Sequence, residues 1–230
     1  MKQISSRQNP VVKRIREAIR EHDQEIAIEG PKAVADAIAA GWKPIVVLER
    51  AVDVTADVFD SLSETRNPQG VIGLFERPHA SARDILLRRD TIAIALDGVQ
   101  DPGNVGTIVR LAAAFDAAGV LLLPGCADAY GPKAIRSSAG AILNVPVANA
   151  TLSDLDGITL IATAMDGAPT DPPTRDAVLI FGNEGAGVSQ ELLRRATRIA
   201  IPMSGRVESL NVASSAAILL ARSYQLRGVL

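Results

Sequence analysis

The sequence predicts an α/β protein with two domains, a small amino-terminal one and a larger one built on a parallel sheet. Strand and helix patterns alternate along the chain, as they do in α/β folds. The apolar segments change from short runs before residue 77 to longer, uninterrupted runs after residue 91. Uninterrupted apolar strands are typical of a parallel sheet that helices cover on both faces.

The first 76 residues predict the small α/β domain. Pro31 and Gly41 bound one helix in the way that prolines begin helices and glycines end them. About 75 residues are enough for such a unit to fold alone. The expected helices span 11–20, 31–41 and 55–63, and the expected strands span 25–30, 44–49 and 70–76.

Residues 77–90 are polar and charged, so we expect a linker or a bridging helix there, and the second domain over 91–230. Ligands of parallel α/β sheets gather at the carboxyl ends of the strands. The loops that follow these strands are therefore the candidates for a site. The expected strands span 91–97, 119–125, 157–165, 177–182 and 198–202, and the expected helices span 104–118, 132–139, 189–196 and 211–227.

Composition excludes several kinds of site. Aromatic residues make up 3% of the chain, too few for the platforms that stack single-stranded bases. One cysteine, Cys126, and two histidines, His22 and His79, exclude a disulfide framework and a Cys/His zinc site, so no metal is expected. No apolar run reaches membrane-spanning length and the amino terminus is polar, so we expect a cytoplasmic protein without a membrane partner.

The formal net charge is −2, yet the first twenty residues are strongly basic. Binding of nucleic acid depends on where charges lie and not only on their sum. The segment is consistent with a solvated helix face and with a binding surface. Its cations are Lys2, Arg7, Lys13, Arg14, Arg16 and Arg20.

Three loops of the second domain carry unusual residues. Over 181–193, glycines at 182, 185 and 187 allow close approach of the backbone to a ligand. No Gly-Lys-Ser/Thr follows, which excludes a P-loop, and the order differs from the dinucleotide-binding one. The loop suits a ligand without a phosphate tail, or a tight turn that places Glu184 close to a helix end.

The other two loops carry polar groups where an ordinary turn needs few. Asn211 is expected to cap the last helix, but Ser209 has no such structural reason. Arg110 interrupts an apolar helix pattern, and a guanidinium is costly to bury unpaired. Arg110 is expected either in a buried ion pair, for example with Glu184, or facing an anionic substrate, with Gly103 and Asn104 at the entrance.

Together the segments DPGNVGTIVRLA, FGNEGAGVS and IPMSGRVESLNVASSAA resemble the three motifs of the SpoU (TrmH-like) class of RNA 2′-O-ribose methyltransferases, within the SPOUT superfamily. The segments NPVVKRI, IEGPKAVADAI and PQGVIGLF resemble the substrate-binding domain that precedes this catalytic domain. The resemblance therefore covers nearly the whole chain.

The resemblance implies an α/β catalytic domain with a carboxyl-terminal trefoil knot, a homodimer whose active sites draw on both protomers, and RNA as the partner, ribosomal RNA being favoured over transfer RNA. The residues that match catalytic positions are Asn104, Arg110, Glu184, Ser209 and Asn211. Contacts to S-adenosyl-L-methionine (AdoMet) are expected from Thr163, Ala164, Gly182, Ile201, Met203 and Leu210. RNA contacts are expected from Asn9, Lys13, Arg14, Lys32 and, within GPKAIRSSAGAI, Arg136.

For such a reaction, Arg110 is a poor general base because guanidinium does not deprotonate in proteins. We expect it to hold a phosphate and stabilise the developing alkoxide, while Ser209, Asn211 or a phosphate-bound water helps to move the proton. Two rival functions stay open on the sequence: an RNA-binding module with a relic AdoMet site, and an α/β enzyme acting on a nucleotide-like small molecule.

Overall fold

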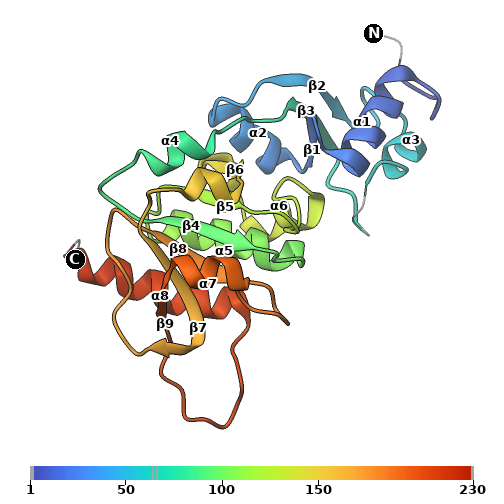
Figure 1. Ribbon diagram of the computed structural model, residues 1–230. Helices are drawn as coiled ribbons and strands as arrows, with labels where there is room; N and C mark the ends of the chain where they lie inside the picture. The colour runs from blue at the N-terminus through green and yellow to red at the C-terminus, as the bar shows by residue number, and fades with distance from the viewer. Residues whose placement is uncertain (1–2, 64, 66, 229–230) are drawn as a thin grey trace. The chain divides into compact units, whose positions relative to one another are not determined.

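The computed structural model describes residues 3–63, 65 and 67–228, and the chain divides into two compact units (Figure 1). The first unit is formed by residues 1–78 together with 130–132, and the second by 79–129 and 133–230. Within the described residues, no helix combines the length and apolarity needed to cross a bilayer.

The first unit contains a three-stranded sheet in the order β1-β3-β2, in which β3 runs antiparallel to both neighbours. Side chains of α1, α3 and β3 share one core; Ile15, Phe59 and Leu74 are each 0% exposed in it. Burial of these apolar side chains stabilises the unit. Its elements are α1 (Pro10–Glu21), β1 (Glu25–Glu29), α2 (Pro31–Ala39), β2 (Pro44–Glu49), α3 (Ala56–Asp60) and β3 (Val71–Glu76).

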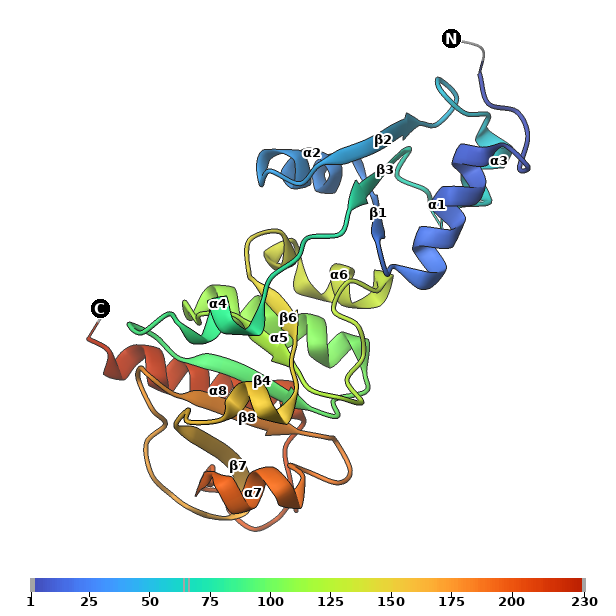
Figure 2. The same cartoon turned by 45° about the horizontal axis from the view of Figure 1, so that its top comes forward.

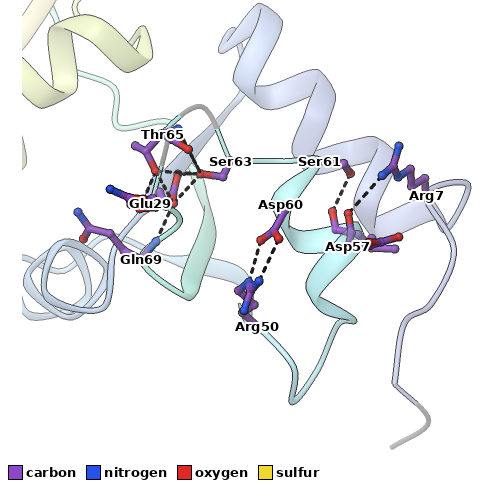
Figure 3. A network of polar contacts seen from close by, with 11 residues as sticks. Arg7, Glu29, Arg50, Asp57, Asp60, Ser61, Ser63, Thr65 and Gln69 are labelled. Atoms are coloured by element: carbon purple, nitrogen blue, oxygen red, sulfur yellow. Dashed lines mark hydrogen bonds and ion pairs between the residues drawn. The ribbon is translucent and has the colours of Figure 1, made fainter.

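A polar network holds the segment between α3 and β3 (Figure 3). The Glu29 carboxylate accepts hydrogen bonds from Ser63 Oγ at 2.8 Å, Thr65 Oγ1 at 3.2 Å and the backbone N–H of Gln69 at 3.1 Å. Arg50 Nε lies 2.7 Å from Asp60 Oδ1. These contacts provide hydrogen-bond partners for the carboxylates of Glu29 and Asp60.

The second unit contains a six-stranded sheet in the order β6-β5-β4-β8-β7-β9, and every pairing in it is parallel. This confirms the parallel sheet predicted from the apolar runs. Its strands are β4 (Ala93–Asp97), β5 (Val120–Leu122), β6 (Val147–Asn149), β7 (Leu160–Ala168), β8 (Val178–Gly182) and β9 (Thr197–Ile199).

Helices cover both faces of this sheet. Ala93 and Ala95 pack in one cluster with side chains of α4, η2 and α7. Because side chains alternate along a strand, Ile94 and Leu96 point to the other face, where α5 and α8 lie side by side (Figures 1 and 2). The helices are α4 (Ala82–Leu86), α5 (Pro102–Ala114), α6 (Pro132–Ser138), η1 (Ala141–Leu143), η2 (Leu152–Leu155), α7 (Gln190–Arg195) and α8 (Val212–Leu226).

Both ends of α8 are fixed to other elements. Arg227, at its carboxyl end, donates to Thr91 Oγ1 at 2.9 Å and to the carbonyl of Phe115. Earlier on the helix, Arg222 Nε lies 2.8 Å from Asp171 Oδ1. At its amino end Asn211 is the N-cap, as predicted. The trefoil knot expected for this part of the chain stays a prediction.

Candidate active site

The carboxyl ends of β4 and β8 bring two of the three predicted loops together. The strands pair in register, with Asp97 opposite Gly182. The segment 98–101 therefore emerges beside the segment 183–189. The third loop, 200–211, leads from β9 into α8, which packs against α5. All three loops meet where parallel sheets bind ligands.

A chain of hydrogen bonds connects the three loops. Asn104, near the start of α5, donates from Nδ2 to Glu184 Oε1 at 2.8 Å. Asn211, before α8, donates from Nδ2 to Asn104 Oδ1 at 3.2 Å. The backbone N–H of Gln100 lies 3.5 Å from the other oxygen of Glu184. Three residues proposed from distant motifs thus form one polar set in the folded chain.

Asn211 has two structural roles in this set. Its Oδ1 accepts the backbone N–H groups of Ala213 at 2.9 Å and Ser214 at 3.3 Å, which satisfies free donors at the start of α8. Its amide nitrogen remains available for Asn104. The cap therefore orients the side chain toward the site as well as beginning the helix.

The environment of Glu184 favours its ionised form. Burial acts to raise the pKa of this carboxyl, but hydrogen bonds from the Asn104 amide and from the backbone of Gln100 and Asp101 act against it, and the pKa falls below the ordinary value of glutamate. Glu184 is consequently a carboxylate at neutral pH. A carboxylate in this position can accept hydrogen bonds or lie near a cation.

Arg110 is not part of this set. It is exposed, and it makes no hydrogen bond or ion pair with the part of the chain that the structure describes. The buried pair with Glu184 considered from the sequence is wrong, because Glu184 is bound by Asn104. Arg110 lies six residues after Asn104 on α5, about 9 Å further along the helix axis.

The loop 200–211 presents its predicted residues to solvent. Ser209 is exposed, and its hydroxyl makes no hydrogen bond with any residue described. Met203 is 40% exposed, whereas Ile201 and Leu210 are half-buried. The structure therefore does not bring Ser209 to Glu184 by any direct contact.

The other residues expected around AdoMet lie in the middle of β7 and at the end of β8. Thr163 and Ala164 belong to β7 and are half-buried. The Thr163 hydroxyl donates to the carbonyl of Ile180 at 3.1 Å. Gly182 ends β8, and a Cβ there would lie 2.1 Å from the backbone carbon of Gly187. Gly182 is thus required by the fold of the loop itself, whatever the ligand.

The residues expected to contact RNA differ in their surroundings. Asn9 caps α1 by accepting the N–H of Val11 at 2.9 Å. Arg14 is paired with Glu25, and Lys32 lies 2.6 Å from Asp36. Lys13 and Arg136 are exposed. Of the two cations predicted on α1, only Lys13 has no ion-pair partner among the described residues.

Sequence reasoning missed several polar residues that support the site. Asp101 caps α5 by accepting the N–H of Gly103 at 2.8 Å, and it also binds Lys133 at 2.6 Å. Asn183 bonds to the carbonyl of Gly98 at 2.8 Å. The one available signal was their position, because each lies in a loop directly after a buried strand.

The fold is that of a parallel-sheet α/β protein, and the candidate residues Asn104 and Glu184 meet at the carboxyl ends of its strands. A family model described as the SpoU rRNA Methylase family matches residues 91–221. This is more than half of the chain. The chain belongs to this family, as its three motifs predicted.

Individual relatives agree with this assignment. The chain is 36% identical over 225 residues to the Bacillus subtilis protein RlmP, named 23S rRNA (guanosine(2553)-2′-O)-methyltransferase; the match covers 90% of this chain and 86% of the relative. It is 28% identical over 193 residues to a 23S rRNA (uridine(2479)-2′-O)-methyltransferase of Streptomyces viridochromogenes, covering 76% and 67%. An AdoMet-bound rRNA methyltransferase from Sinorhizobium meliloti matches with a TM-score of 0.88 and 32% identity, covering 100% of this chain and 98% of that one.

The hydrogen bond from Asn104 predicts a measurable titration of Glu184. Asn104→Ala removes a donor that lowers the pKa of Glu184, so this pKa should rise relative to the wild type. Because the folded-state pKa is depressed, the ionised carboxylate contributes stability above the unfolded-state pKa, and this contribution is lost as the pH falls through the folded-state pKa. NMR titration of the labelled side-chain carboxyl carbon measures the shift.

The matched control is Asn144→Ala, because Asn144 is an exposed asparagine outside the three loops. This variant should leave the titration of Glu184 unchanged. A Glu184 pKa that stays the same or falls in Asn104→Ala would contradict the assigned hydrogen bond.

Proposed function

We propose that this protein transfers a methyl group from AdoMet to the 2′-hydroxyl of a ribose in ribosomal RNA, in the cytoplasm. The observation that carries the proposal is the hydrogen-bonded set Glu184–Asn104–Asn211, which joins all three family motifs at the carboxyl edge of the sheet. Relatives named as rRNA 2′-O-methyltransferases support the reaction and the RNA class.

The residues of the three loops fit AdoMet. The glycine-rich segment 182–187 offers backbone groups to the ligand. The exposed loop 200–211 also offers backbone groups, together with the apolar side chains of Ile201, Met203 and Leu210. The loops carry no P-loop lysine, in keeping with a ligand that lacks phosphate. When bound, AdoMet supplies an electrophilic methyl group on a sulfonium. The Glu184 carboxylate provides a negative charge that suits this cation.

Within this proposal Asn104 orients Glu184, and Asn211 orients Asn104, by hydrogen bonds. The rate gain comes chiefly from alignment of the hydroxyl with the methyl group. Arg110 holds a phosphate of the target and stabilises the alkoxide that develops on the sugar. Ser209, Asn211 or a phosphate-bound water helps to move the proton from the hydroxyl to solvent, because the guanidinium itself cannot accept it.

The separation of Arg110 from the Glu184–Asn104–Asn211 set supports a homodimer. Arg110 is exposed and has no intramolecular partner among the described residues, although it belongs to the same helix as Asn104. In a symmetric dimer the same surface of each protomer meets its counterpart. Arg110 of one protomer then completes the site that contains Glu184 of the other.

We place the RNA contact of the first unit on the exposed face of α1. Lys13 and Arg16 lie three residues apart, so their side chains are neighbours on that face. Both are exposed, and neither forms an ion pair with a described residue. Arg14 and Lys32, in contrast, are already paired with carboxylates. Uncompensated cations are the ones that gain most from a phosphate backbone.

The proposal is tested by incubating the protein with AdoMet carrying a labelled methyl group and with separated, unmodified ribosomal and transfer RNA. We expect label in ribosomal RNA, at one nucleotide whose 2′-oxygen is methylated, as mapped by mass spectrometry of nuclease fragments. Label found only in transfer RNA would show that the substrate is transfer RNA and not ribosomal RNA. Absence of transfer to either RNA would refute the enzymatic function and favour an RNA-binding module.

Mixing two inactive variants tests the shared site. Arg110→Ala and Glu184→Ala should each abolish most methyl transfer. If each site takes Arg110 from one protomer and Glu184 from the other, subunit exchange creates heterodimers with one intact site. Random mixing in equal amounts then restores roughly one quarter of wild-type activity. If both residues act within one protomer, every active site contains one of the two substitutions, and mixing the variants restores no activity.

Neutralising the two cations on α1 that have no ion-pair partner within the described residues should have a selective effect on RNA binding. Lys13→Gln combined with Arg16→Gln should weaken RNA binding and reduce the slope of log affinity against log salt by about 1 to 2, since about one counterion is released per phosphate contact. The paired cations provide the control: Arg14→Gln combined with Lys32→Gln removes the same charge and should change the slope less. Equal slopes in the two double variants would argue against this face as the contact.

A further inference from the structure

The side chain of Asn183 links two loops of the site. Its Nδ2 donates to the carbonyl of Gly98, after β4, at 2.8 Å. Its Oδ1 accepts the backbone N–H groups of Gly185 and Ala186, each at 2.9 Å. An asparagine amide offers two donors and an oxygen with two acceptor positions. Three of these four capacities are used by the protein's own backbone.

The pairing of the strands explains why this contact forms. Asp97 and Gly182 are opposite each other at the last position of the β4–β8 ladder. Gly98 and Asn183 therefore follow side by side, and the Asn183 amide continues the connection by one residue. Asp97 adds a second tie, because its Oδ2 accepts the backbone N–H of Ser189 at 2.7 Å. The segment 183–189 is thus fastened to the end of β4 at both of its ends.

Inside this segment, hydrogen bonds replace apolar packing. Residues 184–187 are all exposed. The backbone N–H of Asn183 donates to the carbonyl of Gly187 at 3.0 Å, and the N–H of Gly187 donates back at 2.9 Å. Together with the two bonds accepted by Asn183 Oδ1, four hydrogen bonds close the turn. Glu184 lies directly within it, so the conformation of this turn sets where its carboxylate points.

We propose that Asn183 is a positioning residue that holds the Glu184 carboxylate within hydrogen-bond reach of Asn104. The acceptor half of its amide shapes the turn, and the donor half fixes the turn against the segment 98–101, which leads into α5. The two sides of the Glu184–Asn104 contact are therefore held by one side chain. This inference rests on the proposed function, in which Glu184 belongs to the methyl-transfer site.

Two substitutions separate the halves of the amide. Asn183→Asp keeps an oxygen that accepts from Gly185 and Ala186 but places a second oxygen against the Gly98 carbonyl, where a donor is needed. Asn183→Ser keeps an acceptor within reach of the turn but is too short to bridge to Gly98, and it serves if the aspartate variant does not fold. Asn144→Asp introduces the same charge at an exposed site outside the three loops and is the control.

The experiment measures single-turnover methyl transfer to the RNA substrate at saturating AdoMet and RNA, with thermal midpoints recorded for each variant. We expect Asn183→Asp to fold and to lower the rate about tenfold, an effect of the size seen for coupled neighbours. Asn144→Asp should keep the wild-type rate. The decisive measurement repeats Asn183→Asp in a Glu184→Gln background, where positioning of a carboxylate no longer matters and little further loss is expected.

Three results would overturn the inference. A wild-type rate in folded Asn183→Asp and Asn183→Ser would show that the bridge to Gly98 is dispensable. An equal loss in the Glu184 and Glu184→Gln backgrounds would show that Asn183 acts on general loop structure rather than through Glu184. If the wild-type protein transfers no methyl group at all, the proposed function fails first, and the inference about Asn183 fails with it.

Discussion

The hydrogen bond between Asn104 and Glu184 is the contact on which the site depends. It joins the start of α5 to the turn after β8, two segments that are eighty residues apart in sequence. The contact exists because β4 and β8 are adjacent parallel strands that end at the same level. The two segments that follow these strands therefore begin at the same edge of the sheet. Without that register the carboxylate would have no amide to bind.

Several separate features of the molecule serve this one contact. Asn211 caps α8 and donates to Asn104, so the third loop is tied to the first two. Asp101 caps α5 and is held by Lys133 at the start of α6. The absence of a side chain at Gly106 matters too, because a Cβ there would lie 2.2 Å from the carbonyl oxygen of Ala134. Close packing of α6 on α5 thus fixes the helix that presents Asn104.

The strand and helix pattern of the second domain was readable from the sequence because each buried strand is a continuous apolar run. β6 was missed because it follows Pro146 and has only two apolar residues, Val147 and Ala148, too short a run to indicate a strand. The antiparallel sheet of the first unit was not predicted either. Alternating strands and helices gave the α/β class correctly, but they do not determine which strand lies in the middle.

Some contacts of the site were predicted from the sequence, and others were not. The motifs placed Asn104, Glu184 and Asn211 correctly in one cluster. The alternative of an Arg110–Glu184 ion pair was wrong, because helix periodicity alone did not show that Arg110 faces solvent. Asn183 was missed because a side chain that bonds only to backbone leaves no spacing pattern in the sequence. Its role becomes visible only when the register of β4 and β8 is known.

A crystal structure of the protein with AdoMet bound tests the central claim most directly. The account predicts that the methyl donor lies at the carboxyl edge of the sheet, between the segments 182–187 and 200–211, with Glu184 still bound to Asn104. Electron density for the donor at any other place, or a Glu184 side chain turned away from Asn104 in the bound state, would contradict it.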